Sequence, residues 1–247
     1  MSEPAALHLA MWSGPRNIST AMMRSWGNRP DTAVCDEPLY AHYLAKTGAP
    51  HPGADEVILH HETDWRCVVA GLTGPPPGGK NIFYQKHMAH HLLPHIGRDW
   101  LDGLVHAFLI REPEEMLTSL LQHLPEPSLA DTGLREQVEI FERVREETGR
   151  VPPVIDARDV LSNPQGVLTK LCEAVGARFV PAMLSWPSGP RNTDGIWARH
   201  WYDAVNRSTG FQPYRPKHER LPARFAALLA TCREHYEKLY AHRLTVT

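Results

Sequence analysis

A short apolar segment that runs into a Gly-Pro turn and then into a helix start constrains this chain more than any other feature. Residues 7–26 read LHLAMWSGPRNISTAMMRSW. Residues 7–12 alternate as a strand does, Gly14 and Pro15 break the strand, and the polar residues that follow favour a helix start. The free N–H groups and the positive dipole end of such a helix attract an anion. The segment therefore predicts a phosphate- or sulfate-binding turn.

Side chains suited to an oxyanion follow the turn. The forked guanidinium of Arg16 can bind two oxygens of a phosphate or sulfate, and the Ser19 and Thr20 hydroxyls can donate to the others. The predicted ligand-binding residues of the turn are Gly14, Pro15, Arg16, Asn17, Ile18, Ser19 and Thr20. The Walker A pattern is not met, because its lysine and second glycine are absent. An ordinary capped helix after a buried strand is the alternative.

A second strand–helix junction lies in the middle of the chain. Residues 104–111, LVHAFLIR, are an apolar run that ends in Arg111, and Pro113 marks the first turn of a helix. Ser119 lies eight positions beyond Arg111, near the margin of the apolar stripe of that helix. Both side chains can contact one ligand if they face the crevice at the edge of an open parallel sheet.

The two junctions together resemble the sulfotransferase family that uses 3′-phosphoadenosine 5′-phosphosulfate. This resemblance implies that the first motif binds the 5′-phosphosulfate of the donor and that Arg111 and Ser119 bind its 3′-phosphate. Arg16 matches the basic residue of the family motif, which continues Ser-Gly-Thr-Thr. Ile18 departs from that motif, because it replaces a glycine and isoleucine does not readily adopt the conformations open to glycine.

The resemblance continues toward the C-terminus. Residues 154–161, VIDARDVL, resemble the family's strand with its acidic turn. Residues 190–201, PRNTDGIWARHW, resemble the Arg-Lys-Gly-x-x-Gly-x-Trp segment that closes over the 3′-phosphate end of the donor. By this match Arg191 is a further donor-binding residue, and Trp197 corresponds to the family tryptophan.

Two residues are candidates for the catalytic base that the resemblance implies. Glu37 lies 21 residues beyond Arg16, about as far as the catalytic Glu of the tyrosylprotein branch. His87, in YQKHM, resembles the histidine of the Lys-x-His segment in the cytosolic branch, with Lys86 as the second basic residue near the transferring sulfate. Neighbouring strand residues alternate faces, so Lys86 and His87 are not both expected at the site. Glu37 is placed before His87, and a structural role remains the alternative for each.

Sulfuryl transfer requires few protein groups. The acceptor hydroxyl loses a proton, the sulfuryl oxygens are held, and charge on the bridging oxygen is neutralised. Arg16 is the candidate for the last two roles. No metal is expected, since cationic side chains and helix N–H groups can supply the charge. His87, His91 and His95 recur every four residues, but Pro94 and the lack of an H-E-x-x-H pattern argue against a zinc site.

Strands and helices alternate along the sequence. The expected strands are 7–12, 33–35, 80–85, 104–110 and 152–156, and the expected helices lie near 17–28, 39–46, 88–96, 113–123, 132–148, 164–176 and 220–241. This order predicts a three-layer α/β fold of the P-loop NTPase-like type, a central parallel sheet flanked by helices, in one domain over residues 1–247. The breaker-rich loops 48–55 and 73–80 are either substrate-contacting lids or surface connections.

Composition limits the partners. A formal charge of −2 gives no broad basic surface for nucleic acid or an anionic membrane. The four cysteines are far apart and form no C-x-x-C pair, which suits a reducing cytoplasm. The N-terminal residues show no leader pattern and no apolar run is long enough to span a bilayer, so we expect a cytoplasmic protein.

The expected activity is transfer of a sulfuryl group from the nucleotide donor to a hydroxyl of a small molecule. A P-loop-type phosphotransferase or nucleotide kinase is one alternative, and a non-catalytic nucleotide-binding module is the other. The sequence leaves the acceptor and the oligomeric state open.

Overall fold

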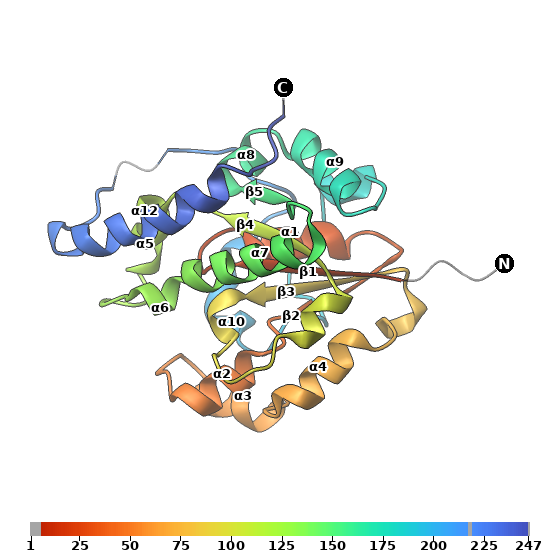
Figure 1. Ribbon diagram of the computed structural model, residues 1–247, viewed down its shortest axis with the longest axis horizontal. Helices are drawn as coiled ribbons and strands as arrows, with labels where there is room; N and C mark the ends of the chain where they lie inside the picture. The colour runs from red at the N-terminus through yellow and green to blue at the C-terminus, as the bar shows by residue number, and fades with distance from the viewer. Residues whose placement is uncertain (1–5, 217–218, 247) are drawn as a thin grey trace.

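A parallel β-sheet is the centre of the fold (Figure 1). The computed structural model describes residues 6–216 and 219–246. These residues form one five-stranded parallel sheet in the order β2-β3-β1-β4-β5. The strands are β1 (Leu7–Ser13), β2 (Thr32–Asp36), β3 (Ile82–Met88), β4 (Val105–Ile110) and β5 (Val154–Asp156). All neighbouring strands are parallel, so every connection between them is a crossover.

Helices cover both faces of the sheet (Figure 1). In chain order they are α1 (Ser19–Gly27), α2 (Tyr40–Thr47), α3 (Ala54–His60), α4 (Trp65–Thr73), α5 (Pro113–Leu120), α6 (Leu129–Thr132), α7 (Leu134–Thr148), α8 (Ala157–Ser162), α9 (Pro164–Ala174), α10 (Ala198–Trp201), α11 (Asp203–Asn206) and α12 (Ala226–Tyr240). None of the helices in these described ranges has both the length and the apolar character needed to cross a membrane.

Side-chain alternation along β1 divides the core into two layers. Leu9 and Met11 pack in the cluster that includes α1, α8 and α9. Ala10 and Trp12 pack in the cluster that includes α7 and α12. A strand buried on both faces in this way is typical of a parallel sheet with helices on either side. The expected three-layer α/β fold is confirmed.

The sheet register gathers polar residues at the carboxyl ends of the strands. Asp36, the last residue of β2, pairs with Lys86 of β3. Lys86 is also level with Met11 of β1, whose end leads into the Gly14 turn. Arg111 directly follows β4. The two junctions of the sequence follow the adjacent parallel strands β1 and β4, so they meet at this edge. Open parallel sheets bind their ligands at the same edge.

Most predicted elements have the expected positions, but the helix expected over 88–96 is wrong. Strand β3 continues to Met88, which pairs with Ser13, and only a single 3₁₀ turn follows at Ala89–His91. Pro94 explains the difference, since proline has no N–H to donate and disfavours helical geometry in the residue before it. His87, His91 and His95 therefore do not share a helix face.

Candidate functional site

The turn between β1 and α1 is closely packed. A Cβ at Gly14 would lie 2.2 Å from the backbone oxygen of Thr132, so only glycine fits there. Buried Asn17 ties the turn to β4 by donating its Nδ2 to the Leu109 carbonyl at 3.3 Å. Within the described residues no side chain caps α1, which leaves the N–H groups of its first turn available to an anion.

Ile18 has a left-handed backbone in spite of its branched side chain. Its φ is 59°, and that of Arg16 is 62°. Left-handed geometry costs a β-branched residue about 1–2 kcal/mol, and such strain persists where the surroundings enforce it. Ile18 therefore holds a left-handed conformation that glycine adopts readily and isoleucine does not.

The second junction contacts the first directly. Arg16 Nε donates to Ser119 Oγ at 3.0 Å, and Arg111 Nη1 donates to the Arg16 carbonyl at 2.8 Å. Arg111 also forms an ion pair with Glu115 at 3.2 Å. Burial and the neighbouring Arg111 charge lower the pKa of Arg16. Two guanidinium groups held side by side, one without a carboxylate partner among the described residues, favour the binding of an anion.

A cavity of about 440 Å³ opens beside both junctions. Its lining includes residues from 15–21, 49–52 and 201–212, together with Glu37, Tyr40, Lys86, Met88, His90, His91, Arg111, Ser119, Leu120, His123, Leu124, Asp131 and Leu161. The first breaker-rich loop of the sequence thus contributes to this cavity, whereas none of residues 73–80 does.

Backbone strain is concentrated at this cavity. In the described part of the chain, three residues other than glycine have positive φ: Arg16, Ile18 and Glu37, the last at 44°. All three line the cavity. Strained residues cluster at ligand-binding and catalytic sites, so the backbone independently marks the same place as the sequence motifs.

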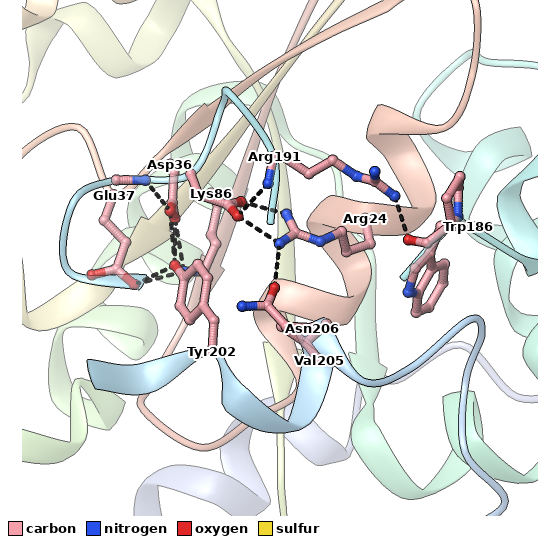
Figure 2. A network of polar contacts seen from close by, with 12 residues as sticks. Arg24, Asp36, Glu37, Lys86, Trp186, Arg191, Tyr202, Val205 and Asn206 are labelled. Carbon is pink, nitrogen blue, oxygen red and sulfur yellow. Dashed lines mark hydrogen bonds and ion pairs between the residues drawn. The ribbon is translucent and has the colours of Figure 1, made fainter. Parts of the chain in front are cut away.

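Lys86 is the centre of a buried polar network (Figure 2). Its Nζ donates to Glu37 Oε1 at 2.6 Å, to Asp36 Oδ1 at 2.9 Å and to the Tyr202 hydroxyl at 2.6 Å. Tyr202 in turn donates to Asp36 at 2.8 Å. Trp197, which the sequence matched to the family tryptophan, donates its Nε1 to the Tyr202 oxygen at 3.3 Å. The network fixes Lys86 and Glu37 at the cavity wall.

Burial and mutual attraction set the charges in this network. Burial raises the pKa of Glu37, and Lys86 opposes that rise. Burial alone would lower the pKa of Lys86, but the carboxylates of Asp36 and Glu37 outweigh it and raise that pKa well above its usual value. Lys86 therefore stays protonated, while Glu37 is a stronger proton acceptor than an exposed glutamate.

His87 is on the opposite face of β3. Its ring stacks on Trp12 with 4.3 Å between centroids, and its Nε2 lies 3.2 Å from Gln85 Oε1. Burial, reinforced by His106, lowers the pKa of His87 to about 3. Met88, two residues after Lys86, lines the cavity instead. The structure thus brings Glu37 and Lys86 to the site but not His87, in keeping with strand alternation.

Arg191 is also placed outside the cavity lining. Its side chain is directed away from Lys86 and toward Trp186, where it donates to the Pro187 carbonyl (Figure 2). In the same segment, Asp194 forms a buried two-bond ion pair with Arg24, and Asn206 accepts a third bond from Arg24 at 3.2 Å. These bonds anchor the segment that carries Tyr202.

Asp36 and Tyr202 were not foreseen as site residues. Asp36 immediately precedes the candidate Glu37, and a carboxylate at the end of a predicted parallel strand was a usable signal. Nothing in the local sequence distinguishes Tyr202 from its aromatic neighbours. The described residues contain no group of three or more His, Cys, Asp or Glu side chains arranged to hold a metal ion.

The structure is a three-layer α/β domain with a cavity beside the two strand–helix junctions. A family model described as a sulfotransferase domain matches residues 7–241. The chain belongs to this sulfotransferase family, as its two junctions indicated.

Two solved structures share the fold. The sulfotransferase domain from the olefin synthase of Synechococcus PCC 7002 has a TM-score of 0.59 and 16% identity, over 99% of this chain and 98% of that one. A sulfotransferase from Alicyclobacillus acidocaldarius has a TM-score of 0.57 and 15% identity, over 98% of both chains. At this level of identity the likeness concerns the fold alone.

Two curated relatives from Arabidopsis thaliana are named as aminotransferase-like proteins, not as sulfotransferases. Branched-chain-amino-acid aminotransferase-like protein 1 is 36% identical over 242 residues, which cover 98% of this chain and 43% of the relative. Branched-chain-amino-acid aminotransferase-like protein 2 is 34% identical over 231 residues, which cover 94% of this chain and 41% of the relative. The chain thus spans less than half the length of either relative.

Proposed function

We propose that this chain transfers a sulfuryl group from 3′-phosphoadenosine 5′-phosphosulfate to a hydroxyl of a small-molecule acceptor. The observation that carries the proposal is the cavity shared by both anion-binding junctions and by the Lys86–Glu37 pair. Membership of the sulfotransferase family supports the reaction class. The donor and the acceptor hydroxyl are the parts that need testing.

The donor's anionic groups are assigned to the two junctions. The first turn of α1, with Ser19 and Thr20, would hold the 5′-phosphosulfate, and Arg111 and Ser119 the 3′-phosphate. Arg16 contacts Ser119 and so lies between the two ends. The two junctions form two adjacent clusters of hydrogen-bond donors. A nucleotide with phosphate groups at both ends fits two such clusters better than a single phosphate does.

Glu37 and Arg16 are assigned to the reaction itself. The acceptor oxygen forms a bond to sulfur while the bond from sulfur to the 5′-phosphate oxygen breaks, which releases 3′,5′-adenosine bisphosphate. Glu37 accepts the hydroxyl proton, and the Arg16 guanidinium stabilises charge on the oxygens around sulfur. Lys86, whose three N–H groups are bonded to Asp36, Glu37 and Tyr202, holds Glu37 in place. Asp36 and Tyr202 are positioning residues, because they act by holding Lys86.

Turnover with labelled donor tests the proposal. The purified protein is incubated with ³⁵S-labelled donor and a metabolite extract, and sulfated products are separated. Label that moves to an organic product with wild-type protein, but not with Glu37→Gln, supports an enzyme. Donor binding with no labelled product in any extract would instead support the non-catalytic nucleotide-binding module.

A further inference from the structure

A row of aromatic rings lines the cavity next to Glu37. Ring centroids are 4.8 Å apart for His91 and Tyr40, 5.8 Å for Tyr40 and His51, 6.1 Å for His51 and Trp201, and 5.2 Å for Trp201 and His123. All five side chains belong to the cavity lining. We call these five residues the aromatic wall. The ring faces of its two larger members, Tyr40 and Trp201, carry negative quadrupole potential, which attracts a cation.

Asp131 adds a carboxylate to the same part of the cavity. Its Oδ2 accepts from the Ser128 backbone N–H at 2.8 Å and from the Ser128 hydroxyl at 2.6 Å, which caps α6. Asp131 takes part in none of the ion pairs found among residues 6–216 and 219–246. Its charge is felt by the aromatic wall, since it opposes the burial that lowers the pKa of His51 and of nearby His90.

Three positively charged side chains line the cavity, and their charge reaches the aromatic wall, since burial and then Arg16 lower the pKa of His123. The lysine and arginine side chains in the lining are Arg16, Lys86 and Arg111. Lys86 is already paired with Asp36 and Glu37, and the two arginines are at the junctions assigned to the donor.

The histidines near Asp131 add no compensating charge. Burial lowers the pKa of His90 to about 4, and burial also lowers the pKa of His91 and His51. These rings are therefore uncharged at neutral pH. An anionic acceptor would meet the Asp131 carboxylate here, whereas the one lining arginine without a carboxylate partner among the described residues, Arg16, is assigned to the donor.

We propose that the acceptor is a hydroxyl compound that carries a protonated amine, which binds against the aromatic wall with its ammonium group facing Asp131. This inference names the substrate class of the proposed sulfotransferase and rests on that function. The Tyr40 backbone N–H donates to the Glu37 carbonyl at 3.0 Å, so the aromatic wall begins next to the proposed base. Glu37 and Asp131 line the same cavity, so the hydroxyl and the amine of one acceptor are assigned to them.

Matched pairs of ligands test the charge requirement. Ethanolamine is compared with its neutral isostere 1-propanol, and tyramine with 4-ethylphenol, by calorimetric titration into the full chain saturated with 3′,5′-adenosine bisphosphate. In at least one pair the amine is expected to bind about 10-fold more tightly than the neutral compound, which corresponds to about 1.4 kcal/mol. In Asp131→Asn that ratio is expected to fall close to one.

Ser128→Ala is the matched control, because it removes the hydroxyl bonded to Asp131 but keeps the carboxylate. This variant should retain the preference for the amine. The inference is overturned if neither amine binds, if the neutral compounds bind equally well, or if the preference survives Asp131→Asn. In each of these outcomes the bisphosphate still binds, so the proposed function stands; failure of the bisphosphate itself to bind would remove both.

Discussion

Arg16 Nε donates a hydrogen bond to Ser119 Oγ at 3.0 Å, and this bond joins two motifs that are 103 residues apart in the sequence. Each motif alone is an arginine near a helix start. The bond places both at the edge of one cavity, together with Lys86 and Glu37. A ligand with two anionic groups can therefore contact both motifs at once.

Glu37→Gln should remove most of the activity without weakening donor binding. Loss of a general base typically costs 10²–10⁴-fold in rate, so kcat should fall by about 100-fold or more. His87→Gln should lower the melting temperature but keep kcat, because the His87 ring packs on Trp12 outside the cavity. Steady-state kinetics and thermal melts check both variants. A larger loss of kcat from His87→Gln than from Glu37→Gln would contradict the assignment of the base.

Lys86→Met should destabilise the fold strongly. It removes the cation that pairs with buried Asp36 and with Glu37, and breaking a buried pair from one side costs about 3–5 kcal/mol in the free energy of unfolding. Tyr202→Phe removes only a hydroxyl and should cost about 1–3 kcal/mol. Urea unfolding curves measure both losses. Equal stability of Lys86→Met and wild type would show that the network is not formed as described.

On acidification, this protein should begin to lose stability at a higher pH than a protein of similar size whose histidines are exposed. Burial holds the pKa of His87 at about 3 and that of His90 at about 4, whereas an unfolded chain binds the proton near pH 6.5. These depressed values contribute stability that is present above about pH 6.5 and is lost as the pH falls toward the folded values.

Each such histidine adds a slope of about 1.4 kcal/mol per pH unit in that range. Urea unfolding between about pH 7 and pH 5 should show the decline, and His87→Gln should make it shallower. An unchanged slope in the variant would mean that His87 is not buried as a neutral ring.

Gly14→Ala should damage both stability and donor binding. The new methyl group would lie 2.2 Å from the Thr132 backbone oxygen, so the turn must move. Overpacking of this kind costs about 1–3 kcal/mol. Gly71→Ala is the control, because a Cβ at Gly71 would meet no atom within 4 Å, and Gly71 is in helix α4, where alanine is neutral or stabilising. Equal melting temperatures for both variants would contradict the close packing of the turn.

The sequence was sufficient for the sheet and for both junctions. Apolar patterning predicted all five strands, and the breaker and arginine of each junction predicted two strand–helix junctions that the structure places at one cavity. Strand alternation also correctly separated Lys86 from His87. These features depend on residues that are close together in the chain, so a single sequence is enough to predict them.

Several helices were missed although their start signals were present. Asp64 caps α4 by accepting from the Arg66 N–H at 2.9 Å, and Asp156 caps α8 by accepting from the Arg158 N–H at 2.7 Å. Aspartate before a helical stretch is a readable N-terminal signal. The network at Lys86 was beyond local reasoning, because Tyr202 is 116 positions away and reaches Lys86 only through the packing of the C-terminal segment.

Calorimetric titration with 3′,5′-adenosine bisphosphate tests the central claim most directly. Wild-type protein should bind it, and Arg16→Ala and Arg111→Ala should each weaken binding by about 10–100-fold, as expected for loss of a charge-assisted bond of about 1.5–3 kcal/mol. Arg224→Ala, an exposed arginine paired only with Glu126 among the described residues, should bind as wild type does. No binding by the wild-type protein, or binding by the two junction variants as tight as that of wild type, would contradict the account.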